Sequence, residues 1–317
     1  MAYNPLLMVG NRNLTVDLML TGKCNEACPF CYGARKPNAS ENGVPIYQNH
    51  RLEMSTEQWK TIIDSLYTIG VRSFNIGGGE PTLRRDLVEI LKHIKSKEEP
   101  ALVYISTNAL ILSLDTELRQ TLYGLVDVFG LSFDGANTES NVQMGRVERH
   151  YEANRELIRQ ISIEMPEKAV KIGTVVSSVN ENGIADIGAE IQKWWAETPF
   201  NLVIWRLFQF SPVEEGYDNR HIYEIGEATF NNIAAQIGSR FTDINVVGRP
   251  HSVAENAYFL VLPTGELALV QDGKHQSITE PLISLTSESL INIIEQHTDT
   301  ISRVEENRRW LPTEVIL

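Results

Sequence analysis

Cysteine is scarce in this sequence of 317 residues: it has only Cys24, Cys28 and Cys31, which lie within one short loop. An odd number of closely spaced cysteines does not predict a disulfide framework, and a chain of this length can bury a core without one. We therefore expect these thiols to serve another purpose.

Long apolar runs and an excess of basic residues are also lacking. No run approaches the roughly 18 apolar residues needed to cross a bilayer, and the first residues do not have the pattern of a secretion signal. The 28 basic against 41 acidic residues give a net charge of −13, which opposes binding to a nucleic-acid backbone. We predict a cytoplasmic protein with no nucleic-acid or membrane partner, although a few basic side chains could still bind a small anion.

Short β-branched runs alternate with helical patterns in the first two thirds of the chain. Ser55 and Gln58 predict a capping box at the start of one helix, which should stop at Gly70. Six strands joined by crossover helices predict a parallel sheet, open or curled into a partial barrel. The expected strands cover 14–20, 72–77, 102–107, 126–134, 170–178 and 202–210, and the clearest helical patterns lie within 55–70, 83–96 and 150–161.

The alternation fades after about residue 215. We predict an N-terminal segment over 1–13, an α/β core over 14–215 and a C-terminal lobe over 216–317 that caps the substrate. The clearest feature of this lobe is a strand pair over 257–270, turned at Pro263, Thr264 and Gly265.

The cysteine spacing C-x-x-x-C-x-x-C follows the first expected strand, where the ligand sites of parallel sheets form. Three thiolates are one short of the four ligands of a 4Fe-4S cube, so one iron would stay open for a ligand other than cysteine. The alternative is structural zinc, with His50 as the nearest fourth ligand, but zinc ligands usually come in two separated pairs.

The stretch "CNEACPFCYG", with Phe30 before the last cysteine, resembles the cluster loop of radical S-adenosylmethionine (radical SAM) enzymes. "GGGEPTLR" at 77–84 is similar to their glycine-glycine-glutamate motif. The resemblance covers residues 14 to about 210 and implies a partial (β/α)6 barrel of TIM type. It also implies a 4Fe-4S cluster on the three cysteines, S-adenosylmethionine as cosubstrate, an external electron donor such as flavodoxin or ferredoxin, and a 5′-deoxyadenosyl radical that takes hydrogen from a small molecule.

Side chains at the other strand ends are expected to hold the cosubstrate. Glycines let a backbone approach a ligand closely, a glutamate can accept from its amine, and Ser, Asn and Asp side chains can bind a ribose. The resemblance implies that Arg146 pairs with the methionyl carboxylate and that adenine lies near Tyr32 and Val176. The expected S-adenosylmethionine contacts are Tyr32, Gly78, Gly79, Glu80, Ser106, Asn108, Ser132, Asp134, Arg146 and Val176.

The absence of further cysteines excludes auxiliary clusters and the subgroups that use a catalytic cysteine. The segments "VKIGTVVSSVN" and "WRLFQF" and the hairpin after residue 257 resemble viperin-like enzymes, which dehydrate cytidine triphosphate (CTP). This resemblance implies that Lys171, Arg206 and Lys274 face a substrate phosphate or carboxylate. Arg206 stands where those enzymes have lysine, Phe210 replaces a cysteine, and "DGK" replaces "GGRK".

Two alternatives stay open at this point. One is a biosynthetic tailoring enzyme for a sugar, amino acid or peptide. The other is a non-catalytic iron–sulfur or zinc protein that senses redox state or recruits a partner.

Overall fold

A computed structural model describes residues 14–33, 37–41, 44–47, 53–99, 101–254 and 259–296. The expected N-terminal segment over 1–13 and the alternative zinc ligand His50 lie outside these residues.

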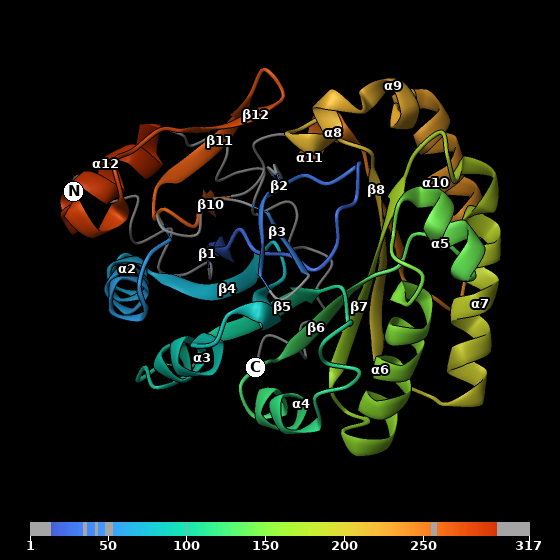
Figure 1. Ribbon diagram of the computed structural model, residues 1–317, viewed down its shortest axis with the longest axis horizontal. Coiled ribbons are helices and arrows are strands. Elements are labelled where there is room, and N and C mark those ends of the chain that lie inside the picture. The colour runs from blue at the N-terminus through green and yellow to red at the C-terminus, as the bar shows by residue number, and fades with distance from the viewer. Residues whose placement is uncertain are drawn as a thin grey trace, which may run out of the picture.

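A ten-stranded sheet organises the described chain, in the order β12-β11-β10-β1-β4-β5-β6-β7-β8-β9 (Figure 1). Neighbours from β10 through β1 to β9 run parallel, whereas β11 and β12 add antiparallel pairs at one edge. Strands β2 (Pro37–Glu41) and β3 (Val44–Tyr47) form a separate antiparallel pair. The main strands are β1 (Leu14–Thr21), β4 (Val71–Gly78), β5 (Leu102–Thr107), β6 (Val128–Ser132), β7 (Ala169–Val176), β8 (Leu202–Gln209), β9 (Val246–Arg249), β10 (Phe259–Val261), β11 (Leu267–Gln271) and β12 (Lys274–Ser277).

Helices connect the parallel strands and cover the outer face of the curved sheet (Figure 1). The capping box predicted from Ser55 and Gln58 is present at the start of α2. The helix expected within 83–96 begins later, at Leu87, because Pro81–Leu83 forms a 3-10 turn first. The helices are α2 (Thr56–Thr68), α3 (Leu87–Lys95), α4 (Thr116–Tyr123), α5 (Thr138–Met144), α6 (His150–Glu164), α7 (Ile184–Glu197), α8 (Glu215–Asp218), α9 (Arg220–Tyr223), α10 (Glu227–Arg240), α11 (His251–Ala254) and α12 (Ser287–Gln296).

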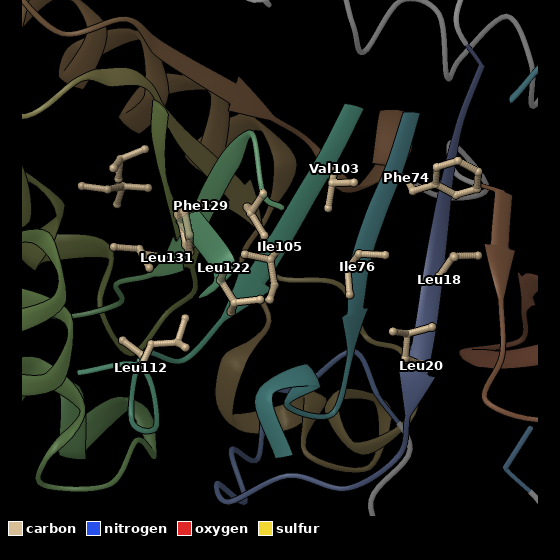
Figure 2. Packing of buried hydrophobic residues seen from close by; sticks show 14 of the residues in the cluster. Leu18, Leu20, Phe74, Ile76, Val103, Ile105, Leu112, Leu122, Phe129 and Leu131 are labelled. Atoms are coloured by element: carbon tan, nitrogen blue, oxygen red, sulfur yellow. The ribbon is translucent and has the colours of Figure 1, made fainter. Parts of the chain in front are cut away.

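The hydrophobic core lies between this helical layer and the outer face of the sheet. Alternate strand residues such as Leu18, Ile76 and Ile105 are fully buried side by side on neighbouring strands (Figure 2). They share one cluster with Trp59 and Ile62 of α2. Each such side chain contributes roughly 1.5–3 kcal/mol when it leaves water. Because successive residues of a strand face opposite sides, this packing turns the intervening residues to the inner face.

The six expected strands are all present, and the prediction of an α/β fold with a mostly parallel sheet is confirmed. The chain after residue 215 adds β9 beside β8 and β10 beside β1, so its strands extend the same sheet. The expected turn joins β10 to β11, where Leu262 N donates to Glu266 O at 2.9 Å.

One connection links this added hairpin to the loop after β8. The backbone N–H of Glu214 donates to Gly273 O, and its carboxylate accepts from His275 N, both at 2.7 Å. The hairpin is thereby held near the cysteine loop, since the His275 ring lies edge-on to Tyr32 with centroids 4.6 Å apart.

Candidate active site

The cysteine loop follows β1 and is held by the end of β4. Gly79 N donates to Thr21 O at 2.7 Å, and Glu80 N donates to Lys23 O at 2.6 Å. A Cβ added to Gly79 would lie 2.0 Å from Lys23 O. Gly78 has a φ of +136°, and a Cβ added there would lie 2.3 Å from Thr21 O. Glycine is required here because the strand end must touch the backbone of the cysteine loop.

Glu80 is fully buried and connects the end of β4 to the end of β5 through hydrogen bonds. Its Oε1 accepts from Thr82 and Thr107, and its Oε2 accepts from Asn108 N at 2.8 Å. Burial raises the pKa of Glu80, although these hydrogen bonds act in the opposite direction. The carboxylate therefore orders the residues that follow β5, and Asn108 in turn donates to Asn25 Oδ1 at 2.6 Å.

The three thiols sit among hydrogen-bond donors. Cys24 Sγ accepts from Glu26 N at 3.4 Å, Cys31 Sγ accepts from Gly33 N at 3.3 Å, and Cys28 Sγ accepts from Arg146 Nη1 at 3.3 Å. Cys24 and Cys28 are buried, and Cys31 is partly exposed. Cys28 Sγ also lies 3.7 Å from Glu26 Oε2. The thiolate is the form of cysteine that binds metal.

Behind Cys28 lies a buried group of four ionisable side chains. Arg146 donates to Glu26 Oε2 at 2.7 Å and, through Nε and Nη2, to Asp134 Oδ2 at 2.9 and 2.6 Å. His150 Nδ1 lies 3.0 Å from Glu26 Oε1, and its Nε2 lies 2.8 Å from Ser132 O. Both ring nitrogens therefore face oxygen atoms.

The charges of this buried group stabilise one another. Burial alone would raise the pKa of Glu26, but Arg146 and His150 hold it far below its usual value. Burial alone would lower the pKa of Arg146, yet Cys28, Asp134 and Glu26 raise it well above its usual value. Glu26 and Arg146 are therefore ionised.

The other expected cosubstrate residues lie in two different environments. Ser106 is exposed and donates to Asn75 Oδ1 at 3.3 Å, and Tyr32 is exposed at the end of the cysteine loop. Asp134 is fully buried and accepts from Val175 N at 2.7 Å as well as from Arg146. Val176 is buried in the hydrophobic core under the helices. Its neighbour Val175 packs near Cys28 instead.

Three cations converge on the inner face of the sheet. In-register pairing puts Arg206 beside Gly173 and Val247, and Arg249 beside Phe208, so these residues share a face with Lys171. Arg206 and Arg249 are only 3% and 4% exposed. Burial lowers the pKa of Lys171 to about 7, together with Arg206 and Arg249, while Asp17 acts in the opposite direction.

Lys274, the third expected substrate cation, lies elsewhere. It begins β12 on the added hairpin and is exposed. The sequence did not predict that Arg249, which pairs with Phe208, would lie on the inner face of the sheet. It also did not predict that Glu26 and His150 would belong to the site. Glu26 could have been noticed as an acid inside the cysteine motif, but its partner His150 is 124 residues away.

Comparison with known proteins identifies the family. The sequence profile described as the Radical SAM superfamily matches residues 18–187, which is more than half of the chain. The chain belongs to the radical SAM superfamily. It is therefore an S-adenosylmethionine-dependent enzyme, and the non-catalytic alternative is wrong.

Two relatives of this radical SAM enzyme match most of its length. An S-adenosylmethionine-dependent nucleotide dehydratase of Selenomonas ruminantium is 24% identical over 76% of this chain and 83% of its own length. A protein of the same name from Flammeovirga pacifica is 26% identical over 86% of this chain and 88% of its own length. The predicted resemblance to viperin-like enzymes is confirmed as a similarity.

Solved structures support the fold. Streptococcus suis SuiB bound to its precursor peptide SuiA superposes with a TM-score of 0.63 at 16% identity. The match covers 85% of this chain but only 63% of SuiB, less than two thirds of that protein. The prediction of a partial TIM-type barrel is thereby confirmed. Within the described residues, no helix is both long and apolar enough to span a membrane.

Proposed function

We propose that this radical SAM enzyme removes water from a nucleoside triphosphate, using a 4Fe-4S cluster on Cys24, Cys28 and Cys31. The names and coverage of the two dehydratase relatives support the reaction. The observation that carries the proposal is the trio of inner-face cations, Lys171, Arg206 and Arg249, in a protein whose net charge is −13.

The cysteine loop fits an iron–sulfur cluster by its donor chemistry. Three sulfurs receive N–H donors, and an apolar shell of Phe30, Met144, Phe210 and Tyr223 packs around Cys28. Over the part of the chain that the structure describes, no three His, Cys, Asp or Glu side chains lie close enough together to bind one metal ion. A cube takes one thiolate per iron and does not require such a grouping.

When bound, the cluster and S-adenosylmethionine supply a 5′-deoxyadenosyl radical that takes one hydrogen atom from the substrate. Loss of that hydrogen and of a hydroxyl group amounts to the loss of one water. An external donor such as flavodoxin or ferredoxin supplies the electrons. The protein itself must hold the substrate in place and limit access of water.

The cations and the opposite wall of the sheet suit different parts of a nucleotide. Arginine binds phosphate through paired N–H donors, so Arg206 and Arg249 are suited to the triphosphate. On the opposite side, Asn75 donates to Asp17, and Ser106 donates to Asn75, which forms a polar row suited to ribose hydroxyls.

Lys171 lies between these two groups and can move a proton. Its pKa of about 7 means that its ammonium group can lose a proton near neutral pH. We propose that Lys171 Nζ protonates the departing hydroxyl group, because a lysine with a pKa near the operating pH is an efficient acid. An arginine could not do so at neutral pH.

The test is anaerobic turnover of the reconstituted protein with dithionite and each of the four common ribonucleoside triphosphates. We expect 5′-deoxyadenosine to form faster with one triphosphate than without substrate, together with a product lighter by one water. The corresponding nucleoside, which lacks phosphates, is the matched control and should not accelerate the reaction. Iron-loaded protein that makes 5′-deoxyadenosine at one rate with or without every triphosphate would contradict the nucleotide assignment.

A further inference from the structure

We infer that His275 is a further ligand-binding residue of the site, that its Nε2 accepts a hydrogen bond from an N–H or O–H group of a bound nucleoside, and that Glu214 positions it. The inference rests on the proposed function, in which both the cosubstrate S-adenosylmethionine and the substrate triphosphate carry a nucleoside. Neither His275 nor Glu214 has a part in the reaction as proposed above.

The first argument is a buried nitrogen that lacks a partner. The His275 side chain is only 5% exposed, and its Nε2 has no hydrogen-bond partner among the residues that the structure describes. Its Nδ1 lies 3.6 Å from Glu214 Oε1, which favours the tautomer that carries hydrogen on Nδ1. Burial lowers the pKa of His275 to about 4, so the ring is neutral at pH 7. Nε2 is then a buried acceptor, and such groups nearly always have a partner.

The second argument is the place of this ring beside the cysteine loop. The His275 ring lies edge-on to Tyr32 with centroids 4.6 Å apart, and Tyr32 directly follows the proposed cluster ligand Cys31. The loop that contains Glu214 is attached to the same cysteine, because Gly216 N donates to Cys31 O at 3.1 Å. A ligand bound at the end of the cysteine loop therefore has His275 next to it.

The third argument is backbone strain at Glu214. This residue has a φ of +51° and a ψ of −116°, a conformation that normally requires glycine. In this conformation its N–H donates to Gly273 O, and its Oε1 accepts from His275 N, both at 2.7 Å. The two hydrogen bonds join the loop after β8 to the hairpin of β11 and β12, whose strands lie at the opposite edge of the sheet (Figure 1). The strained residue thereby fixes the position of the His275 ring.

The chemistry of Nε2 selects the part of the ligand that it can bind. An ionised phosphate or carboxylate offers only acceptors, so neither can pair with an acceptor nitrogen. A nucleoside offers donors, namely ribose hydroxyl groups and, in some bases, an amino group or a ring N–H. His275 is therefore suited to the nucleoside part of a ligand, whereas Arg206 and Arg249 are suited to phosphate.

The experiment measures two dissociation constants on the reconstituted, cluster-loaded protein: that of S-adenosylmethionine and that of the ribonucleoside triphosphate that the wild type binds best. His275→Leu removes the acceptor, and His275→Gln places an amide oxygen near the position of Nε2. We expect His275→Leu to weaken the binding of one ligand about tenfold, because the donor of that ligand loses its partner, and His275→Gln to restore most of it. The control Gln276→Leu changes the exposed neighbouring residue and should bind both ligands as the wild type does.

The variant Glu214→Gly tests the positioning role. Glycine suits the backbone conformation but lacks the carboxylate, so the variant should load iron normally while the His275 ring is held less firmly. We expect the same ligand to bind about threefold more weakly, because the ring occupies the binding orientation for only part of the time.

The ligand that weakens supplies the donor, so the two constants distinguish the adenosine of S-adenosylmethionine from the nucleoside of the substrate. Two results overturn the inference: His275→Leu binds both ligands within about twofold of the wild type, or it loses binding that His275→Gln does not restore. If His275→Leu loads no iron, Glu214→Gly decides, since weaker binding of one ligand supports the inference and unchanged binding of both refutes it. A wild type that binds no triphosphate would instead refute the proposed function, and the constant for S-adenosylmethionine would still test His275.

Discussion

Replacing Lys171 by methionine should make the protein more stable at neutral pH, and the gain should vanish at high pH. Lys171 is partly buried near Arg206 and Arg249, and its pKa falls from 10.5 in the unfolded chain to about 7 in the folded protein. Between these two values the unfolded chain binds more protons than the folded protein. The stability of the wild type therefore rises with pH over this window.

The size of the effect follows from the same two values. At about 1.4 kcal/mol per pKa unit, the shift corresponds to at most about 5 kcal/mol, and relaxation of a buried site usually reduces such a figure. We expect Lys171→Met to be about 2–5 kcal/mol more stable relative to the wild type at pH 7 than at pH 10. Methionine suits this comparison because it fills a similar volume without charge.

Urea unfolding of the cluster-free protein, under reducing conditions at several pH values between 7 and 10, measures this difference. Lys193→Met is the matched control, since Lys193 is half exposed in a surface ion pair with Glu190. Its difference from the wild type should stay within about 0.5 kcal/mol at every pH. If the Lys171→Met and wild-type stabilities instead run parallel from pH 7 to pH 10, Lys171 is not a buried cation and its proposed role as an acid is wrong.

Three further predictions concern the site. Glu80→Gln replaces one acceptor oxygen by an NH2 group, so either the hydrogen bond from Asn108 N to Oε2 or the hydrogen bonds to Oε1 are lost. Urea unfolding should show a free energy of unfolding lower by about 1–3 kcal/mol, whereas the exposed control Glu117→Gln should change it little. Gly79→Ala forces a Cβ against the backbone of Lys23 and should reduce iron content after reconstitution, whereas Gly77→Ala, with no atom within 4 Å of the new Cβ, should load normally. Arg249→Gln should raise the KM for the triphosphate roughly 10- to 100-fold, because a charged hydrogen bond contributes about 1.5–3 kcal/mol, and an unchanged KM would remove Arg249 from the substrate site.

Local patterns explain why much of the fold could be predicted. Strand periodicity and β-branched runs located all six core strands, and the capping box of Ser55 and Gln58 located the start of α2, because each depends on residues close in sequence. The cysteine spacing likewise belongs to one short loop. A regular alternation of strand and helix then predicts parallel pairing, which gathers the strand ends at one edge.

Contacts between distant segments could not be predicted in this way. The three residues of β10 pair with β1 although about 240 residues separate them in the chain, and no local pattern of so short a strand selects that neighbour. The packing of Val175 near Cys28 and of Val176 in the main core also depends on the sheet as a whole, since a strand end can turn either of two adjacent valines inward.

The sequence by itself therefore determined the class of chemistry: three thiols at a fixed spacing at the end of a strand, in an alternating α/β chain. Only the tertiary structure decided what surrounds them. It joined Arg249 to Lys171 and Arg206 on one face of the sheet, and it bound Glu26 to His150, 124 residues apart. The physical reason is that side chains which bind a ligand or support a metal site act through space, and their partners come from strands and helices brought together by burial of the core.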